Sequence, residues 1–339
     1  MRRRILYDIE IAGRNISSLL NPVLQQINVH DGSDNEADTA SIVIDDSYGQ
    51  TILANARDPI TIRLGLEGEG VREVFRGFID EPRFKFDRST GRTLSIEAKS
   101  VDLEGKAKEP VEKYWDDESL QTILNDAMGL AGIPIQVADE FASITRDYEA
   151  MDGEDPLSFV ARIAREVGAT FKVMGDRAVF AARNTGNGVD GQALEAFRVA
   201  YGQNLIRCDI SPIIPRAKFS AFKHRWFDFA AGKFIEEVTE AVGKSDLVKN
   251  APYATQGLAK ETSSGEKTEA ERKGGEGTIV AMGSSIPQAD GKCLLSGARP
   301  GVDGSYIISS VDHSATRGAG YTVTLEVKRP DDGAGTDNR

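Results

Sequence analysis

Apolar and polar residues alternate along much of the first hundred positions. Ile60, Ile62 and Leu64, for example, lie on one face of a period-two pattern, which is the spacing of a β-strand with one buried face. Several short strands separated by turn residues are typical of a barrel or sandwich. We therefore expect residues 1–106 to form a first β-barrel, completed by strands that come later in the chain. The strands of this region are predicted over residues 4–12, 23–30, 39–45, 59–65, 74–79 and 93–99.

The period changes after residue 106. Apolar residues recur at helical spacing over residues 118–128. The carboxylates of residues 116–118 favour the start of this helix, because negative charge stabilises a helix N-terminus. A glycine and a proline then end it. This helix opens a predicted α/β insert domain over residues 107–188.

A second helix and a hairpin complete the predicted insert. Asp155 is a suitable N-cap and Pro156 a suitable first residue for a helix that runs to about residue 167. Residues 171–180 alternate around a Gly-Asp turn, which predicts a hairpin. The insert is therefore expected to be a small helix-plus-hairpin unit between two β regions.

Strand patterns return in residues 189–330, which we interpret as a second β-barrel region. A polar stretch over 241–277 interrupts it, with one charged helix predicted near 264–273. The tail at 331–339 is rich in Gly and Asp and is predicted to be disordered. The fold class expected for the whole chain is α+β, mainly β.

Length and charge exclude several classes of protein. The chain has 339 residues and a net charge of −12, which predicts two or three domains and disfavours binding to nucleic acid or to anionic membranes. No signal peptide or long apolar segment is evident, so we expect a chain made in the cytoplasm without stable membrane insertion. The two cysteines, Cys208 and Cys293, lie far apart and fit buried free thiols in a reducing compartment.

The sequence offers little reaction chemistry. His30, His224 and His313 lack the spacing of a metal site, and no GxSxG motif supports a nucleophile near Cys208. Gly243 to Ser245 resembles the end of a P-loop, but the glycine required upstream is absent. We predict no catalytic residue, no cofactor and no metal ligand, and hence no enzyme activity.

An aromatic, basic segment over residues 218–229 is the main candidate for a binding surface. At period two, Phe222, His224 and Trp226 share one face, and Phe227 lies on the other. Such a segment can stack on single-stranded nucleic acid. An interior strand of a barrel or a subunit contact is favoured instead, since Trp is a frequent interface anchor. Phe222, Trp226 and Phe227 are therefore our candidate interface or barrel-interior residues.

Two stretches resemble a known family. Residues 154–173 read EDPLSFVARIAREVGATFKV, and residues 295–314 read LSGARPGVDGSYIISSVDHS, followed by GYTVTLEV at 320–327. Both are similar to the phage late control protein D family, the tail baseplate hubs of P2-like contractile phages. Related hubs occur in type VI secretion spikes and R-type bacteriocins. The resemblance spans most of the chain, but the polar stretch 244–277 departs from it.

The resemblance implies a fold and a role. It implies two tail-tube-like β-barrels side by side, and a homotrimer whose pseudo-sixfold ring joins the tail tube to the central spike. The expected partners are the central spike protein, the tail tube protein, the tape-measure protein and other baseplate components. The expected location is the virion tail baseplate, assembled in the host bacterial cytoplasm. A tail-associated cell-wall hydrolase and a monomeric β-rich binding module stay open as alternatives.

Overall fold

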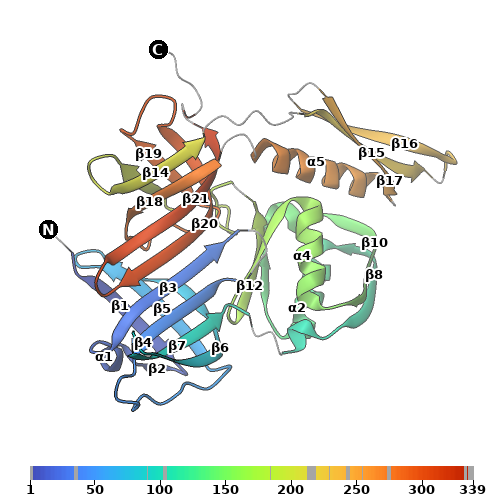
Figure 1. Cartoon of the computed structure of the whole chain (residues 1–339). Helices are drawn as coiled ribbons and strands as arrows, with labels where there is room; N and C mark the ends of the chain where they lie inside the picture. Colours follow the sequence, from blue (N-terminus) through green and yellow to red (C-terminus); the bar gives the residue numbers. More distant parts are fainter. Residues whose placement is uncertain are drawn as a thin grey trace.

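Figure 1 shows the computed structural model of the chain. Two β regions lie one above the other, a helical unit lies beside them, and a sheet with one helix extends above that unit. The mainly β prediction is confirmed. The residues that the structure describes are 3–33, 37–89, 91–101, 105–183, 185–211, 219–228, 230–241, 245–253, 255–272, 276–331 and 334. Of the predicted disordered tail, all but residues 331 and 334 lies outside them.

The first β region follows the predicted alternation closely. Its strands pair antiparallel in the order β3-β4-β7-β6-β5-β1-β2, and every second residue of β5 is buried, as half-exposed strands require. The short helix α1 (Ser17–Leu20) covers one end. The strands are β1 (Ile5–Ile11), β2 (Arg14–Asn15), β3 (Leu24–Gly32), β4 (Thr39–Asp45), β5 (Pro59–Leu66), β6 (Gly70–Asp87) and β7 (Gly91–Lys99).

The second β region is joined to the first by hydrogen-bonded pairing. Strand β20 pairs with β3 over Ser310–Thr316 and Gln26–Gly32, so a strand after the insert does extend the first sheet. Across the described residues the two regions form one sheet of 13 strands, in which a path of hydrogen-bonded neighbours runs from β14 to β2; β19 pairs with β20 beside this path, and β13 pairs with β19. The strands are β13 (Phe197–Ala200), β14 (Leu205–Ser211), β18 (Glu276–Met282), β19 (Lys292–Ser296), β20 (Gly304–Thr316) and β21 (Gly320–Asp331).

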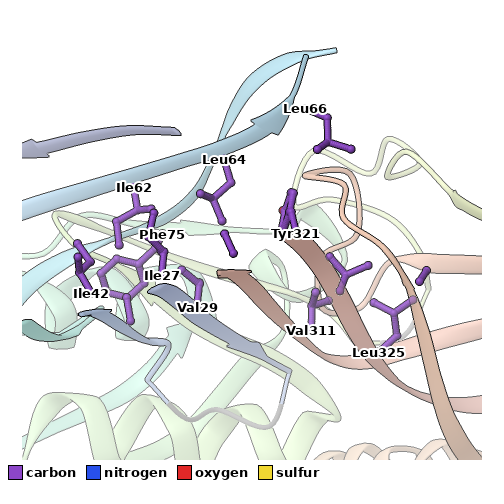
Figure 2. Packing of buried hydrophobic residues seen from close by; sticks show 14 of the residues in the cluster. Ile27, Val29, Ile42, Ile62, Leu64, Leu66, Phe75, Val311, Tyr321 and Leu325 are labelled. Carbon is purple, nitrogen blue, oxygen red and sulfur yellow. The ribbon is translucent and has the colours of Figure 1, made fainter. Parts of the chain in front are cut away.

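Both β regions share one apolar core. Figure 2 shows Ile27, Ile42 and Ile62 of the first region in the same cluster as Val311 and Leu325 of the second. These side chains are at most 1% exposed. Burial of such a side chain contributes roughly 1.5–3 kcal/mol. The shared core therefore makes the two regions one unit of packing.

The insert has its own core, separate from that of the β regions. Helices α2 and α4 pack on each other between small sheets, and Asp155 caps α4 as predicted, because its side chain accepts a hydrogen bond from Ser158 N at 3.0 Å. The turn at Gly175 is also confirmed. The elements are η1 (Lys106–Lys108), β8 (Val111–Ser119), α2 (Leu120–Ala131), β9 (Ile135–Val137), α3 (Asp139–Ala142), β10 (Thr145–Glu154), α4 (Pro156–Val167), β11 (Ala169–Met174) and β12 (Arg177–Ala182).

The arm, which we define as residues 219–272, differs from the prediction. The aromatic segment was expected in the second barrel, but β15 (Phe219–Asp228) pairs with β16 (Lys233–Glu240) and β17 (Ser245–Tyr253) in a sheet of their own. Helix α5 (Gln256–Arg272) packs on this sheet and on α4. It begins eight residues earlier than the charged helix we predicted. No helix among the described residues is long and apolar enough to cross a membrane.

Candidate functional site

A buried charge cluster lies where the insert meets both β regions. Lys172, on β11 of the insert, forms ion pairs with Asp31 at the end of β3 and with Asp38 just before β4; its Nζ lies 3.1 Å from Asp38 Oδ2. Asp31 Oδ2 also accepts a hydrogen bond from Ala289 N of the second β region at 2.9 Å. Thr170 adds a bond to Asp290 at 2.8 Å. Three parts of the chain therefore converge on two carboxylates and one ammonium group.

The electrostatics of this cluster follow from burial and close pairing. Burial alone lowers the pKa of Lys172, but the two neighbouring carboxylates outweigh it and raise that pKa. Burial raises the pKa of Asp31, but the ion pair and hydrogen bond with Lys172, together with the hydrogen bond from Ala289 N, outweigh burial and hold that pKa below the ordinary value. Asp38 shares the same ammonium group, and burial raises its pKa to about 6. The arrangement therefore holds three segments together through one ammonium group and two carboxylates.

The three candidate residues of the aromatic segment have different surroundings. Phe222 is 2% exposed on β15, the strand that α5 covers. Trp226 and Phe227 are half-buried near the end of the same strand, where Phe227 packs edge-on against Phe234 at 5.1 Å. Because β15 belongs to the arm sheet, none of the three lies inside the two-region ladder. Their role at an interface stays a prediction.

Trp226 and Phe227 line a cleft between the arm and the insert. This hollow has a volume of about 450 Å³, and its other walls come from β10 and from the first turn of α5. Arg146 of β10 is 5% exposed, with its Nη2 3.1 Å from Glu261 Oε2. Within the described residues, none of its three guanidinium nitrogens makes a hydrogen bond, and neither does Trp226 Nε1; each of these four atoms is closed off from solvent. Sequence reasoning missed Arg146, because nothing near it in the sequence marks it as buried.

The three histidines have structural surroundings. His313 is buried, and its Nδ1 lies 2.8 Å from the Tyr321 hydroxyl, which donates to Ser284 O; burial lowers the pKa of His313 to about 4. His224 is fully buried beside Glu266, and burial lowers its pKa also. His30 pairs with Asp312 at the surface. Within the part of the chain that the structure describes, no group of three or more metal-binding side chains forms.

The loop between β4 and β5 carries an apolar surface that the sequence analysis did not single out. Tyr48 is 88% exposed, Ile52 91% and Leu53 55%. Exposed apolar residues that stand singly are common, but three within six positions indicate a contact surface. We call Tyr48, Ile52 and Leu53 the apolar loop.

Sequence comparison finds a phage relative. No family model matches the chain. A probable baseplate hub protein of Escherichia phage 186 is 24% identical over 172 residues, which are 51% of this chain and 43% of that protein. The match thus covers less than half the length of the curated relative.

Structure comparison extends the likeness to nearly the whole chain. A 43 kDa prophage tail protein of Shewanella oneidensis aligns over 96% of this chain and 99% of its own, with a TM-score of 0.70 and 15% identity. A tail protein of Neisseria meningitidis aligns over 98% of both chains with a TM-score of 0.69 and 13% identity. An E. coli component of the type VI secretion system aligns over 98% of this chain and 79% of its own, with a TM-score of 0.58 and 12% identity. The predicted resemblance is confirmed: the chain is similar to a phage baseplate hub protein in sequence and has the fold of phage tail proteins.

Proposed function

We propose that this protein is a structural hub of a contractile phage-tail baseplate, a homotrimeric ring that joins the tail tube to the central spike. The observation that carries the proposal is the agreement of two comparisons. The sequence relative is a probable baseplate hub protein, and the fold of a prophage tail protein matches along 96% of the chain. The spike, the tube and the tape-measure protein are the proposed partners.

Features of the surface support an assembly of several copies. The strand ladder ends at β14 and at β1 with its short partner β2, and exposed strand edges invite pairing unless a neighbour covers them. The apolar loop is likewise suited to burial against another protein. Together these features favour a ring over the alternative of a monomeric binding module.

The proposed role is mechanical. The relatives are structural tail proteins, which disfavours the second alternative, a cell-wall hydrolase. Hydrolysis of a glycan needs a matched acid and base that face a substrate. The buried charge cluster around Lys172 instead pairs its lysine with two carboxylates, between the insert and the first β region.

Light scattering tests the proposal directly. The purified chain is measured alone and after mixing with the spike protein of the same tail. We expect a complex that contains three copies of the chain, formed with the spike protein if the chain alone stays monomeric. An Ile52→Asp variant, which places a charge in the apolar loop, should shift the mixture toward monomer. A monomer with no bound spike under both conditions would refute the hub, and release of soluble muropeptides from peptidoglycan would favour the hydrolase.

A further inference from the structure

A cleft of about 540 Å³ lies where the first strand of the chain meets the second β region. Ile5 and Tyr7 of β1 line it together with Ile206 of β14 and Met282 at the end of β18. Since β14 is one end of the strand path and β1 lies next to the other end, both ends of the 13-stranded sheet border this cleft. We call it the β1 cleft.

The backbone of β1 presents an unpaired edge to the β1 cleft. Ile9 N donates to Ser17 Oγ, and Ile9 O accepts from Ile16 N, so the backbone groups of Ile9 point away from β5. Every second residue of a strand directs its N–H and C=O groups to the same edge, so those of Ile5 and Tyr7 point that way too. Among the described residues, only β2 pairs with β1 along this edge, and it reaches only the last two residues of β1.

The lining of the β1 cleft is positively charged. Arg3, Arg4 and Arg317 line it, and no carboxylate of the described residues does, although the whole chain has a net charge of −12. Arg3 pairs with Glu69. Burial raises the pKa of the Tyr7 hydroxyl, and the positive charges of Arg317 and Arg4 act against that rise. Both guanidinium groups therefore act on the same part of the cleft.

The free edge, the apolar walls and the charge together specify the occupant. An unpaired strand edge binds an extended segment through main-chain hydrogen bonds, and side-chain contacts give specificity. Ile206 and Met282 are 55% and 41% exposed in the cleft, so one face of the segment should be apolar. Side chains of a strand alternate between its two faces, so the other face is free to carry carboxylates that match the arginines.

We propose that the β1 cleft is a docking site for an acidic, extended segment of another protein, which adds to β1 as a further strand. Its backbone pairs with Ile5 and Tyr7, its apolar side chains cover Ile206 and Met282, and its carboxylates face the arginines. This inference goes beyond the proposed ring, because one copy of the chain holds the complete site. Peptide binding and ring assembly can therefore fail separately.

Fluorescence anisotropy tests the site on the full chain with a fluorescein-labelled peptide of four Glu-Val repeats. A peptide of four Lys-Val repeats reverses the charge, and a peptide of two Glu-Glu-Val-Val repeats keeps the composition but removes the alternation. We expect saturable binding of the Glu-Val peptide and at least about tenfold weaker binding of the other two. Because β1 borders one edge of the bound strand, N-methylation of one alternate set of nitrogens in the Glu-Val peptide should abolish binding.

Charge-swap variants then assign the binding to this cleft. Arg4→Glu should weaken binding of the Glu-Val peptide about fivefold and strengthen binding of the Lys-Val peptide. A variant that had merely lost its fold would weaken both. Arg14→Glu is the matched control, because Arg14 is exposed on the neighbouring strand β2, outside the lining of the cleft. It should bind both peptides as the parent chain does.

Several outcomes would overturn the proposal. They are a Glu-Val peptide that does not saturate, a matched peptide that binds as well, N-methylation of either alternate set without effect, and equal effects of Arg4→Glu and Arg14→Glu. A further one is that excess Glu-Val peptide separates copies of the chain in light scattering, because a second copy would then be the occupant of this edge.

Discussion

Replacing Lys172 with Met tests whether the charge cluster holds the insert to the β regions. The methionine retains most of the side-chain volume and removes the ammonium group. Asp31 and Asp38 then remain as two carboxylates whose side chains are 11% and 10% exposed, without their shared counter-ion. Removal of one partner from a buried ion pair costs about 3–5 kcal/mol. Since a domain is stable by only about 5–15 kcal/mol, this loss is large.

The measurement is urea unfolding followed by circular dichroism at pH 7.5, with Lys99→Met as the matched control. Lys99 pairs with Asp80 at 2.8 Å, but their side chains are 36% and 44% exposed, so its loss should cost about 1 kcal/mol or less. The difference between parent and Lys172→Met should shrink at pH 5. Without the ammonium group, both buried carboxyl groups take up protons there and their repulsion disappears.

A second variant separates charge from packing. In Lys172→Met with Asp31→Asn and Asp38→Asn, no charge is stranded, and the free energy of unfolding should recover most of the loss. Our reading of the cluster fails if Lys172→Met costs no more than Lys99→Met. It also fails if the triple variant is as unstable as the single one, because the loss would then come from packing.

Three further predictions concern other parts of the chain. Folding holds the pKa of His313 near 4, below its ordinary value of about 6.5; its stabilising contribution is therefore complete above pH 6.5 and lost toward pH 4, by up to about 3 kcal/mol. A His313→Gln variant should show a smaller drop in urea stability over that range, and an equal drop would contradict this. Ile52→Asp should reduce assembly in light scattering without lowering the melting temperature. Gly129→Ala should stabilise α2 by about 0.5–1 kcal/mol, because nothing lies within 4 Å of the added Cβ, whereas Gly77→Ala should destabilise the chain, because its Cβ would meet Lys99 O at 2.1 Å.

Local patterns predicted those elements whose causes are local. Side chains of a β-strand point alternately to its two faces, so a half-buried strand alternates apolar and polar residues. The spacing of Ile60, Ile62 and Leu64 therefore predicted the face that the structure buries. The start of α4 was also predicted correctly, because the capping residue Asp155 and the first helical residue Pro156 are adjacent in the sequence.

The prediction for the acidic run 116–118 was wrong. These residues lie in β8, where Asp116 pairs with Tyr148, and α2 begins only at Leu120 with Ser119 as its cap. Carboxylates favour a helix start by about 0.3–1 kcal/mol. Pairing with β10 outweighs that preference, and the sequence around 116–118 contains no sign of it.

Non-local features left no signal. Alternation showed that the aromatic segment is a strand, but a pattern does not say which sheet a strand joins, and β15 joined the arm. Lys172 and its partner Asp31 are 141 residues apart. The start of α5 was missed because Gly257, in its first turn, weakens the helical pattern there. The structure explains Gly265, since a Cβ there would lie 3.0 Å from Glu166 O of α4.

The insert contacts the β regions on one side and the arm on another, and the two contacts differ in how many of their buried polar groups form hydrogen bonds or ion pairs. This difference bears on the proposed hub. At the β regions, Lys172, Asp31 and Thr170 all find partners. A buried polar cluster whose hydrogen bonds are all made fixes the relative position of the segments that it joins, because its bonds are directional; an apolar contact does not fix that position as closely. At the arm, within the described residues, the guanidinium nitrogens of Arg146 and the indole N–H of Trp226 make no hydrogen bond. A ring between tube and spike, as we propose, needs its β regions and insert fixed relative to each other. The satisfied contact lies between those two parts, where such a ring needs a fixed geometry.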